Sequence, residues 1–304
     1  MKKTPPVLSS PAARRVFLRQ ASVLAMAAAW PMPQLWAAEN AAPAKRMVSI
    51  GGALTEIIYA LGGSQGLVGV DTTSLYPEAA TKLPSVGYAR TLSSEGILAL
   101  APSLVVATED AGPPAVLRQI QAAGVPVHIL AANDRFEGVV DRIQRLGSLL
   151  GRDSEAAMFI ERFKTDWQRA RAPILARKAS GPRVLFVLSH VPGQVMVGGQ
   201  GSSAEAMLHY VAAQNAVQGF HGFKPLTPEA VIAAQPEVVL FTAQGLTVVG
   251  GVDGALQLPG LAQTPAGQHR RIVALEAMFM LGFGPRLPQA VTALDQLLNK
   301  AMMT

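Results

Sequence analysis

The sequence predicts an α/β fold with two Rossmann-like lobes, each built on a parallel sheet, and a ligand cleft between them. Short apolar strands alternate with amphipathic helices from Arg46 onward, and the same alternation restarts at Arg183. A long helical pattern separates the two sets, and a similar helix–strand segment occurs in each of them. These three observations indicate two lobes of similar design joined by a stiff helix.

Four strands are predicted in the first half, because short, mainly apolar runs alternate there with helical patterns. They cover residues 47–50, 67–70, 104–107 and 127–130. Helices are predicted over residues 94–100, 114–123 and 136–150, and between the first two strands from the spacing of Leu54, Ile57, Ile58 and Leu61. The N-terminal lobe is therefore assigned to residues 45–152. His128 lies inside the fourth strand, and we expect it to be a core residue rather than a metal ligand.

The connecting helix is predicted over residues 153–178, where apolar side chains recur on one helical face. The C-terminal lobe is assigned to residues 180–304. Its predicted strands cover residues 183–188, 238–241 and 272–275, and its predicted helices cover residues 204–213, 228–234 and 288–300.

An internal duplication is visible in the segments 93–108 and 227–242, which match at five of sixteen positions with an offset of 134 residues. A weaker match joins residues 56–68 to 205–217. Similar units in both halves favour two lobes of one design. Two such lobes facing each other form a cleft, where a ligand commonly binds.

The composition excludes several classes of protein. The chain has 304 residues, 50% of them hydrophobic, and no cysteine. Disulfides, thiolate metal sites, cysteine nucleophiles and a lipid-modified cysteine are therefore excluded. Five basic residues precede residue 38 and no acidic residue does, so the net charge of +6 comes mostly from this segment. The remainder is close to neutral, and we expect no nucleic-acid partner.

Residues 1–38 are predicted to be a twin-arginine-type signal peptide. Arg14 and Arg15 precede an apolar run of about ten residues and a small-residue segment, the order typical of export signals. No later segment is long and apolar enough to span a bilayer. The sequence therefore predicts a soluble, exported protein.

Enzyme motifs are absent from the sequence. It contains no phosphate-binding loop, no G-x-G-x-x-G fingerprint, no nucleophile elbow, and no histidine pair at metal-ligand spacing. An exported two-lobed protein without these motifs is expected to be a binding protein rather than an enzyme.

Two segments resemble the periplasmic haem-binding proteins of bacterial haem ABC importers. They are residues 86–98, which contain Gly87-Tyr88-Ala89-Arg90, and residues 282–288, Gly-Phe-Gly-Pro-Arg-Leu-Pro. The resemblance extends over residues 45–302, and the wider family includes cobalamin- and ferric-siderophore-binding proteins. It implies a monomeric periplasmic protein that carries ferric haem to an inner-membrane permease dimer.

The resemblance implies that Tyr88 is the haem iron ligand and that Arg90 supports it by a hydrogen bond to the phenolate. Ferric iron is a hard cation that phenolate oxygen suits, as in catalase. A free tyrosine has a pKa near 10, and a nearby cation or the iron itself favours the phenolate. His190 follows the first strand of the second lobe and is a candidate for a second haem contact. The iron is then five-coordinate, or six-coordinate if His190 or another residue binds the far side.

Further residues are candidates for contacts around the haem. Arg286, Lys224 and Arg90 are alternative partners for a propionate. The candidates for apolar cover are Met196, Met207, Phe220, Phe223, Met278 and Phe279.

Glu95 and Glu229 occupy the same position in the repeated segment, each at the start of a helix. A carboxylate there stabilises the helix by itself. The resemblance also implies that each glutamate docks on the permease, one from each lobe.

Two hypotheses besides haem delivery remain open, and a haem chaperone or sensor that works with no importer is a further possibility. The same fold binds a ferric siderophore or a cobalamin in other family members. An exported α/β enzyme with a bound cofactor is the third hypothesis, and it requires a cluster of acid–base or nucleophilic residues that the sequence does not show.

Overall fold

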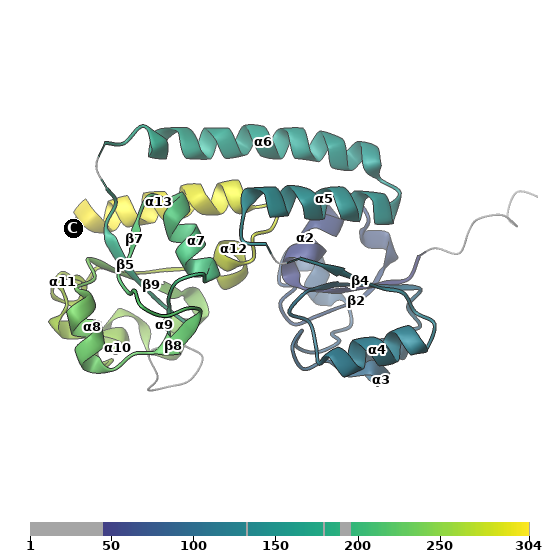
Figure 1. Cartoon of the computed structure of the whole chain (residues 1–304), viewed down its shortest axis with the longest axis horizontal. Helices are drawn as coiled ribbons and strands as arrows, with labels where there is room; N and C mark the ends of the chain where they lie inside the picture. The colour runs from purple at the N-terminus through teal and green to yellow at the C-terminus, as the bar shows by residue number, and fades with distance from the viewer. Residues whose placement is uncertain (1–44, 132, 179, 189–195, 304) are drawn as a thin grey trace, which may run out of the picture. The chain divides into compact units, whose positions relative to one another are not determined.

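The computed structural model describes residues 45–303 except 132, 179 and 189–195. The signal peptide predicted over residues 1–38 and His190 lie outside the described residues. The predicted α/β class is confirmed: two sheets are flanked by helices (Figure 1). No described helix is both long enough and apolar enough to cross a membrane.

The N-terminal lobe contains a parallel four-stranded sheet in the order β2-β1-β3-β4. Its strands are almost entirely apolar, as expected where helices cover both faces. The strands are β1 (Met47–Ile50), β2 (Leu67–Val70), β3 (Leu104–Thr108) and β4 (Val127–Leu130). The helices are α2 (Gly52–Ala60), α3 (Ser94–Leu98), α4 (Pro114–Ala122) and α5 (Phe136–Leu150), with 3₁₀ turns η1 (Ser64–Gly66) and η2 (Glu78–Lys82).

The C-terminal lobe contains a mixed sheet in the order β10-β9-β5-β6-β8, with β7 also pairing with β5. The strands are β5 (Arg183–Val187), β6 (Met196–Gly198), β7 (Gln214–Asn215), β8 (Phe223–Pro225), β9 (Val238–Thr242) and β10 (Ile272–Leu275). The helices are α7 (Ser203–Tyr210), α8 (Pro228–Ala234), α9 (Ala243–Val248), α10 (Gly251–Leu256), α11 (Pro265–Gln268), α12 (Ala277–Leu281) and α13 (Leu287–Met303), with η3 (Leu261–Gln263). The expectation of a purely parallel sheet is wrong here, because β6 pairs antiparallel with both β5 and β8.

The duplication predicted from the sequence is visible in the topology. The parallel pairs β7–β5, β5–β9 and β9–β10 repeat the pairs β2–β1, β1–β3 and β3–β4. The bounds of β3 and β9 differ by 134 residues, which is the offset of the sequence match. Ser93 and Thr227, at the same offset, each cap the next helix with a side-chain oxygen.

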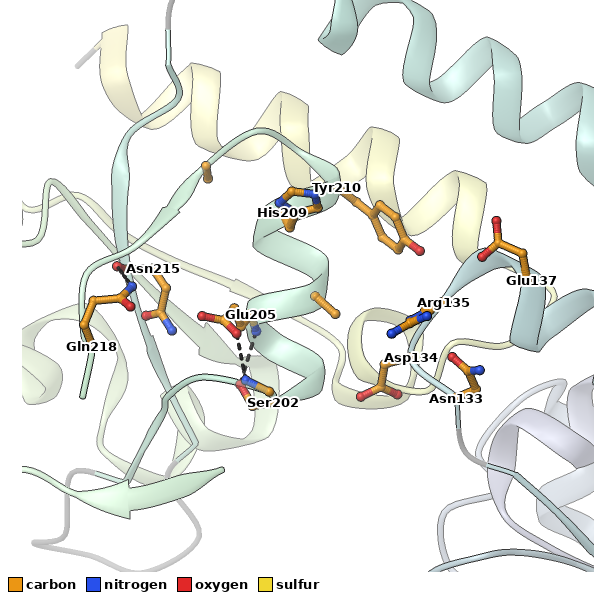
Figure 2. A pocket seen from close by; sticks show the side chains of 13 residues that line it. Asn133, Asp134, Arg135, Glu137, Ser202, Glu205, His209, Tyr210, Asn215 and Gln218 are labelled. Atoms are coloured by element: carbon orange, nitrogen blue, oxygen red, sulfur yellow. Dashed lines mark hydrogen bonds between the residues drawn. The ribbon is translucent and has the colours of Figure 1, made fainter. Parts of the chain in front are cut away.

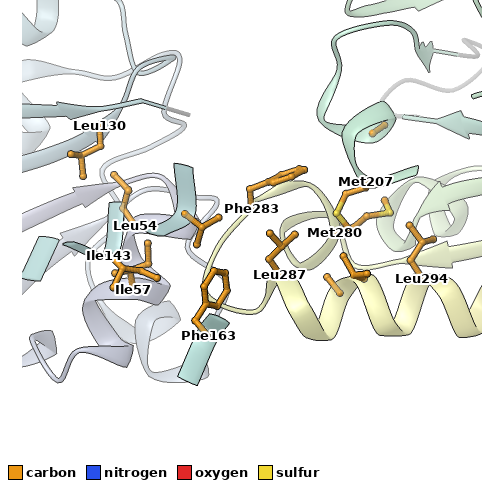
Figure 3. Close-up of a cluster of buried hydrophobic side chains, with 14 of the residues drawn as sticks. Leu54, Ile57, Leu130, Ile143, Phe163, Met207, Met280, Phe283, Leu287 and Leu294 are labelled. Atoms are coloured by element: carbon orange, nitrogen blue, oxygen red, sulfur yellow. The ribbon is translucent and has the colours of Figure 1, made fainter. Parts of the chain in front are cut away.

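The described residues form three hydrophobic clusters: each lobe has one of its own, and the third, under helix α6 (Asp153–Leu175), spans both lobes. Helix α6 packs against both α5 and α13, as Figure 1 shows. The shared cluster runs from Leu54 and Ile143 of the N-terminal lobe through Phe163 and Phe283 to Met207 of the C-terminal lobe (Figure 3). The apolar face of α6 recognised in the sequence is thus part of this core.

Candidate functional site

A cleft with a volume of about 400 Å³ lies between the two lobes. This is within the range typical of small-molecule sites. Most of the N-terminal residues that line it follow the carboxyl ends of the parallel strands, where ligands of open α/β sheets bind. The side chains that line it from the N-terminal lobe include Thr72, Thr73, Leu75, Tyr88, Arg90, Thr108, Asp110, Asp134 and Arg142. Those from the C-terminal lobe include Leu188, Ser203, Phe223, Glu276, Met278 and Leu281.

Tyr88 lines this cleft and is 44% exposed. It lies on the loop between η2 and α3, and its neighbours hold that loop in place. The backbone N–H of Val86 donates to the carbonyl of Val70 at 2.9 Å, and the side chain of Ala89 is buried. Gly87 has φ +90°, a conformation that glycine adopts without strain. The Gly-Tyr pair therefore turns the chain so that Tyr88 is accessible between two anchored neighbours.

Arg90 lines the same cleft and pairs with Asp110. Its Nε and Nη2 both donate to Oδ2 of Asp110, at 3.1 and 2.9 Å. Among the described residues, no hydrogen bond joins Arg90 to the Tyr88 hydroxyl. The support of a phenolate by Arg90 stays a prediction. Asp110 was not singled out from the sequence, although its place just after β3, at the carboxyl end of a parallel strand, was a usable signal.

A buried carboxylate organises the N-terminal wall. Asp71, directly after β2, is 2% exposed. Its Oδ1 accepts from the backbone N–H of Gly51 at 2.9 Å, and its Oδ2 accepts from the Thr73 hydroxyl at 2.7 Å. Thr73 in turn accepts from the backbone N–H of Gly52. This network joins the start of α2 to the loop after β2, and so fixes the polar side of the cleft.

The C-terminal wall is mainly apolar. Of the residues expected to cover a porphyrin, Phe223 and Met278 line the cleft. Met207 lies in the core instead. Glu276 caps α12 by accepting from the backbone N–H groups of Met278 and Phe279 at 2.7 and 2.6 Å. The cap fixes the position of Met278 on the wall.

Arg286 is held by a buried carboxylate and does not line the cleft. Its Nε donates to Oε2 of Glu56 at 2.8 Å, and its guanidinium stacks on the ring of Tyr76. Glu56 is 5% exposed, and burial raises its pKa against the lowering effect of Arg286.

Lys224, another candidate for a propionate, lies 5.5 Å from the ring centroid of Phe220.

Arg142 and Asp134 also line the cleft, and Arg142 forms a contact between the lobes. Arg142 is 2% exposed and donates to the carbonyl oxygens of Ala131 and Phe283, both at 2.7 Å. It therefore joins the loop after β4 to the segment before α13. Burial raises the pKa of Asp134 to about 6, against the lowering effect of Arg142.

A second, larger cavity of about 840 Å³ adjoins the first at Asp134. Figure 2 shows its polar lining, with Asp134, Arg135 and Glu137 on one side and Glu205 and His209 of α7 on the other. The phenol of Tyr210 accepts from the backbone N–H of Phe136 at 2.9 Å and so links the two sides. No group of three or more Asp, Glu or His side chains among the described residues is arranged to hold a metal ion.

Glu95 and Glu229 are both exposed, in the first turns of α3 and α8. The structure therefore places both where a partner can reach them. The pKa of Glu229 is lowered by a hydrogen bond from its own backbone N–H at the start of α8 and by one from the side chain of Thr227. This is the stabilisation of a helix start expected from the sequence. Docking of the two glutamates on a permease is a separate proposal.

Solved structures with the same fold include haem-binding proteins. The periplasmic heme-binding protein BhuT, solved in complex with two hemes, is 48% identical, covers 85% of this chain and 99% of its own, and superposes with a TM-score of 0.82. The periplasmic heme-binding protein RhuT of Roseiflexus sp. RS-1, in apo form, is 42% identical over 85% of this chain and 99% of its own, with a TM-score of 0.81.

Curated relatives include a protein that binds a different ligand. The vitamin B12-binding protein of Vibrio cholerae is 25% identical over 259 residues, 82% of this chain and 87% of its own length. These matching proteins are binding proteins rather than enzymes. The sequence profile described as periplasmic binding protein matches residues 47–278. The chain therefore belongs to the periplasmic binding protein family and is a periplasmic substrate-binding protein.

Proposed function

We propose that this protein binds ferric haem in the cleft between its lobes and delivers it to an inner-membrane ABC importer. The observation that carries this proposal is the place of Tyr88, an accessible phenol that shares the cleft with apolar side chains of the opposite lobe. Phenolate is a suitable ligand for ferric iron. The apolar side chains Phe223, Met278 and Leu281 suit the face of a porphyrin.

The similarity to the two haem-binding structures supports haem as the ligand, because the match to this chain covers nearly the whole length of each. In this proposal haem is the transported cargo, and the iron arrives with it. His190 is the candidate for a second contact with the haem. Export by the twin-arginine route to the periplasm, directed by residues 1–38, completes the proposed pathway.

The test is an absorption titration of residues 39–304 with ferric haem, beside a Tyr88→Phe variant. The wild-type protein should show saturable binding and a high-spin ferric tyrosinate spectrum, and Tyr88→Phe should lose that spectrum. Tyr76→Phe is the matched control, since Tyr76 is 49% exposed but does not line the cleft. Saturable binding with an unchanged spectrum in Tyr88→Phe would assign the iron ligand to another residue, and His190 would be tested next.

Cobalamin is the second candidate ligand, favoured by the match to the vitamin B12-binding protein of Vibrio cholerae. A cobalamin carries its own axial base and needs no tyrosinate. A parallel titration with cyanocobalamin therefore separates the two. Two results together would identify cobalamin rather than haem as the cargo. They are saturable cobalamin binding that Tyr88→Phe leaves unchanged, and no saturable binding of haem.

We further propose that Glu95 and Glu229 dock on the two halves of the permease dimer. One exposed carboxylate at equivalent positions in each lobe suits a partner with two-fold symmetry. Glu95→Lys and Glu229→Lys combined should abolish haem uptake through a reconstituted importer, while haem affinity is unchanged. Glu78→Lys and Glu161→Lys combined provide the control, because both residues are exposed and lie away from α3 and α8. Normal uptake with the first pair of substitutions would contradict the docking proposal.

A further inference from the structure

Asp110 holds Arg90 by one edge of its guanidinium. The Nε and Nη2 of Arg90 donate to the same oxygen of Asp110, at 3.1 and 2.9 Å. A guanidinium has five N–H groups in a fixed plane. This contact uses two of them along one edge, and three remain available. Asp110 therefore sets the plane of the Arg90 head group before any ligand enters.

The backbone fixes the two residues relative to each other. The N–H of Gly112 donates to the carbonyl of Ala89 at 2.8 Å, and the N–H of Leu92 donates to the carbonyl of Gly112 at 2.9 Å. The loop after β3 is thus tied to the loop that carries Tyr88 and Arg90. Both loops line the same cleft.

The Arg90–Asp110 pair is too exposed to be explained by folding stability. The two side chains are 63% and 44% exposed, and ion pairs this accessible contribute little to stability. Most other exposed pairs in the described residues, such as Arg145–Asp141, lie outside the cleft. The Arg90–Asp110 pair lies inside it, beside Tyr88, so its position points to a role in ligand binding.

We propose that Asp110 is a positioning residue for haem, acting through Arg90; this rests on the proposed function. Asp110 fixes the orientation of Arg90, so that the remaining N–H groups of Arg90 donate to the Tyr88 oxygen or to a haem carboxylate. Because the side chain is already held by Asp110, it loses little further conformational entropy when the ligand binds. This role requires an acceptor oxygen at position 110 but no negative charge. The negative charge of Asp110 partly offsets the positive charge of Arg90. The other charged side chains among the described residues that line the cleft are Asp134, Arg142 and Glu276.

A double-mutant cycle over Arg90 and Asp110 tests this role, with haem transfer to apomyoglobin and the ferric absorption spectrum as readouts. Asp110→Ala should increase the haem dissociation rate about tenfold, the size typical of lost support behind a metal ligand, and should reduce the tyrosinate bands. In the Arg90→Ala background, Asp110→Ala should add nothing, because its effect passes through Arg90. Asp110→Asn retains an acceptor oxygen and should restore most of the wild-type rate and spectrum.

Asp253→Ala is the matched control, because Asp253 forms an exposed pair with Arg270 outside the cleft. Three results would overturn the inference: wild-type rate and spectrum in Asp110→Ala, additive effects in the double variant, or an Asp110→Asn variant as impaired as Asp110→Ala. Failure of the proposed function gives a different result. The wild-type protein would then show no tyrosinate spectrum or no saturable haem binding, before any Asp110 variant is compared.

Discussion

The two lobes repeat one strand order, yet the repeated unit ends differently at the cleft. In the N-terminal lobe, β3 ends at Thr108, and the loop that follows carries Asp110 into the cleft. In the C-terminal lobe, β9 ends at the equivalent Thr242, which is buried and caps α9 at once. One repeat therefore offers a polar loop to a ligand, and the other offers none.

The difference extends to the walls of the cleft. The N-terminal wall contains the Asp71 network, Tyr88 and the Arg90–Asp110 pair, whereas the C-terminal wall presents mainly apolar side chains such as Met278. A planar ligand with an iron centre and an apolar ring system needs both kinds of surface. The comparison teaches that a duplicated fold supplies two different surfaces when the loops after equivalent strands diverge.

The largest expected effect comes from breaking the contact between the lobes at Arg286. Arg286→Ala leaves the buried carboxylate of Glu56 without its partner, so the free energy of unfolding should fall by about 3 kcal/mol. Urea unfolding of residues 39–304 measures it. Arg270→Ala is the control, because its pair with Asp253 is exposed. A loss no larger than in Arg270→Ala would contradict this account, and replacing both partners, Glu56→Leu with Arg286→Met, should recover most of the stability.

The next effect concerns the polar wall. Asp71→Asn should lower the free energy of unfolding by about 2 kcal/mol, because an amide cannot accept all the hydrogen bonds that the buried carboxylate accepts. Chemical denaturation is the measurement, and Asp141→Asn on the exposed face of α5 is the control. Equal stability of the two variants would mean that the network does not hold the wall.

The apolar wall should affect affinity and leave the iron ligand unchanged. Met278→Ala removes apolar contact surface, which should weaken haem binding about tenfold while the tyrosinate spectrum persists. Titration with ferric haem measures both, and Met158→Ala, at an exposed position on α6, is the control. A changed spectrum would show that the two walls are not independent.

The smallest effect is at Asp134, on the border between the two cavities. Its pKa of about 6 in the folded protein lies above the ordinary value of 3.8. Stability from this group is therefore complete below about pH 4 and is lost as the pH rises through 6. Asp134→Asn should raise the free energy of unfolding by about 1 kcal/mol at neutral pH, because the half-buried group is partly solvated.

Unfolding experiments at about pH 7.5 and pH 4 check this prediction, and the Asp134→Asn gain should vanish at the lower pH. Asp253→Asn, on the exposed surface, should change stability at neither pH. A gain of equal size at both pH values would show that the ionisation of Asp134 is not its cause.

The strands and longer helices could be predicted because their patterns are local. Phe136–Leu150 and Val127–Leu130 have the predicted bounds. The short strands β6 and β8 could not be predicted, since each has three residues with Gly or Pro among them and forms only by pairing with distant segments. His128 is exposed rather than part of the core, because β4 is an edge strand of its sheet.

The site was only partly predictable, because local sequence patterns do not show contacts between residues far apart in the chain. Tyr88 and Arg90 lie in a short motif that the sequence shows directly, and the structure places both in the cleft. Asp110 is 20 residues from Arg90, and Glu56 is 230 residues from Arg286. Such pairs depend on which loops the sheets bring together, and no local pattern indicates them.

The shared hydrophobic core has a consequence for how the chain folds. Leu54, Phe163 and Met207 belong to one cluster although they come from three different parts of the sequence. A fragment ending before α6 would expose the half of this cluster that it keeps. Because this cluster joins the lobes, we expect calorimetry of residues 39–304 to record one unfolding transition, where independent domains would give two.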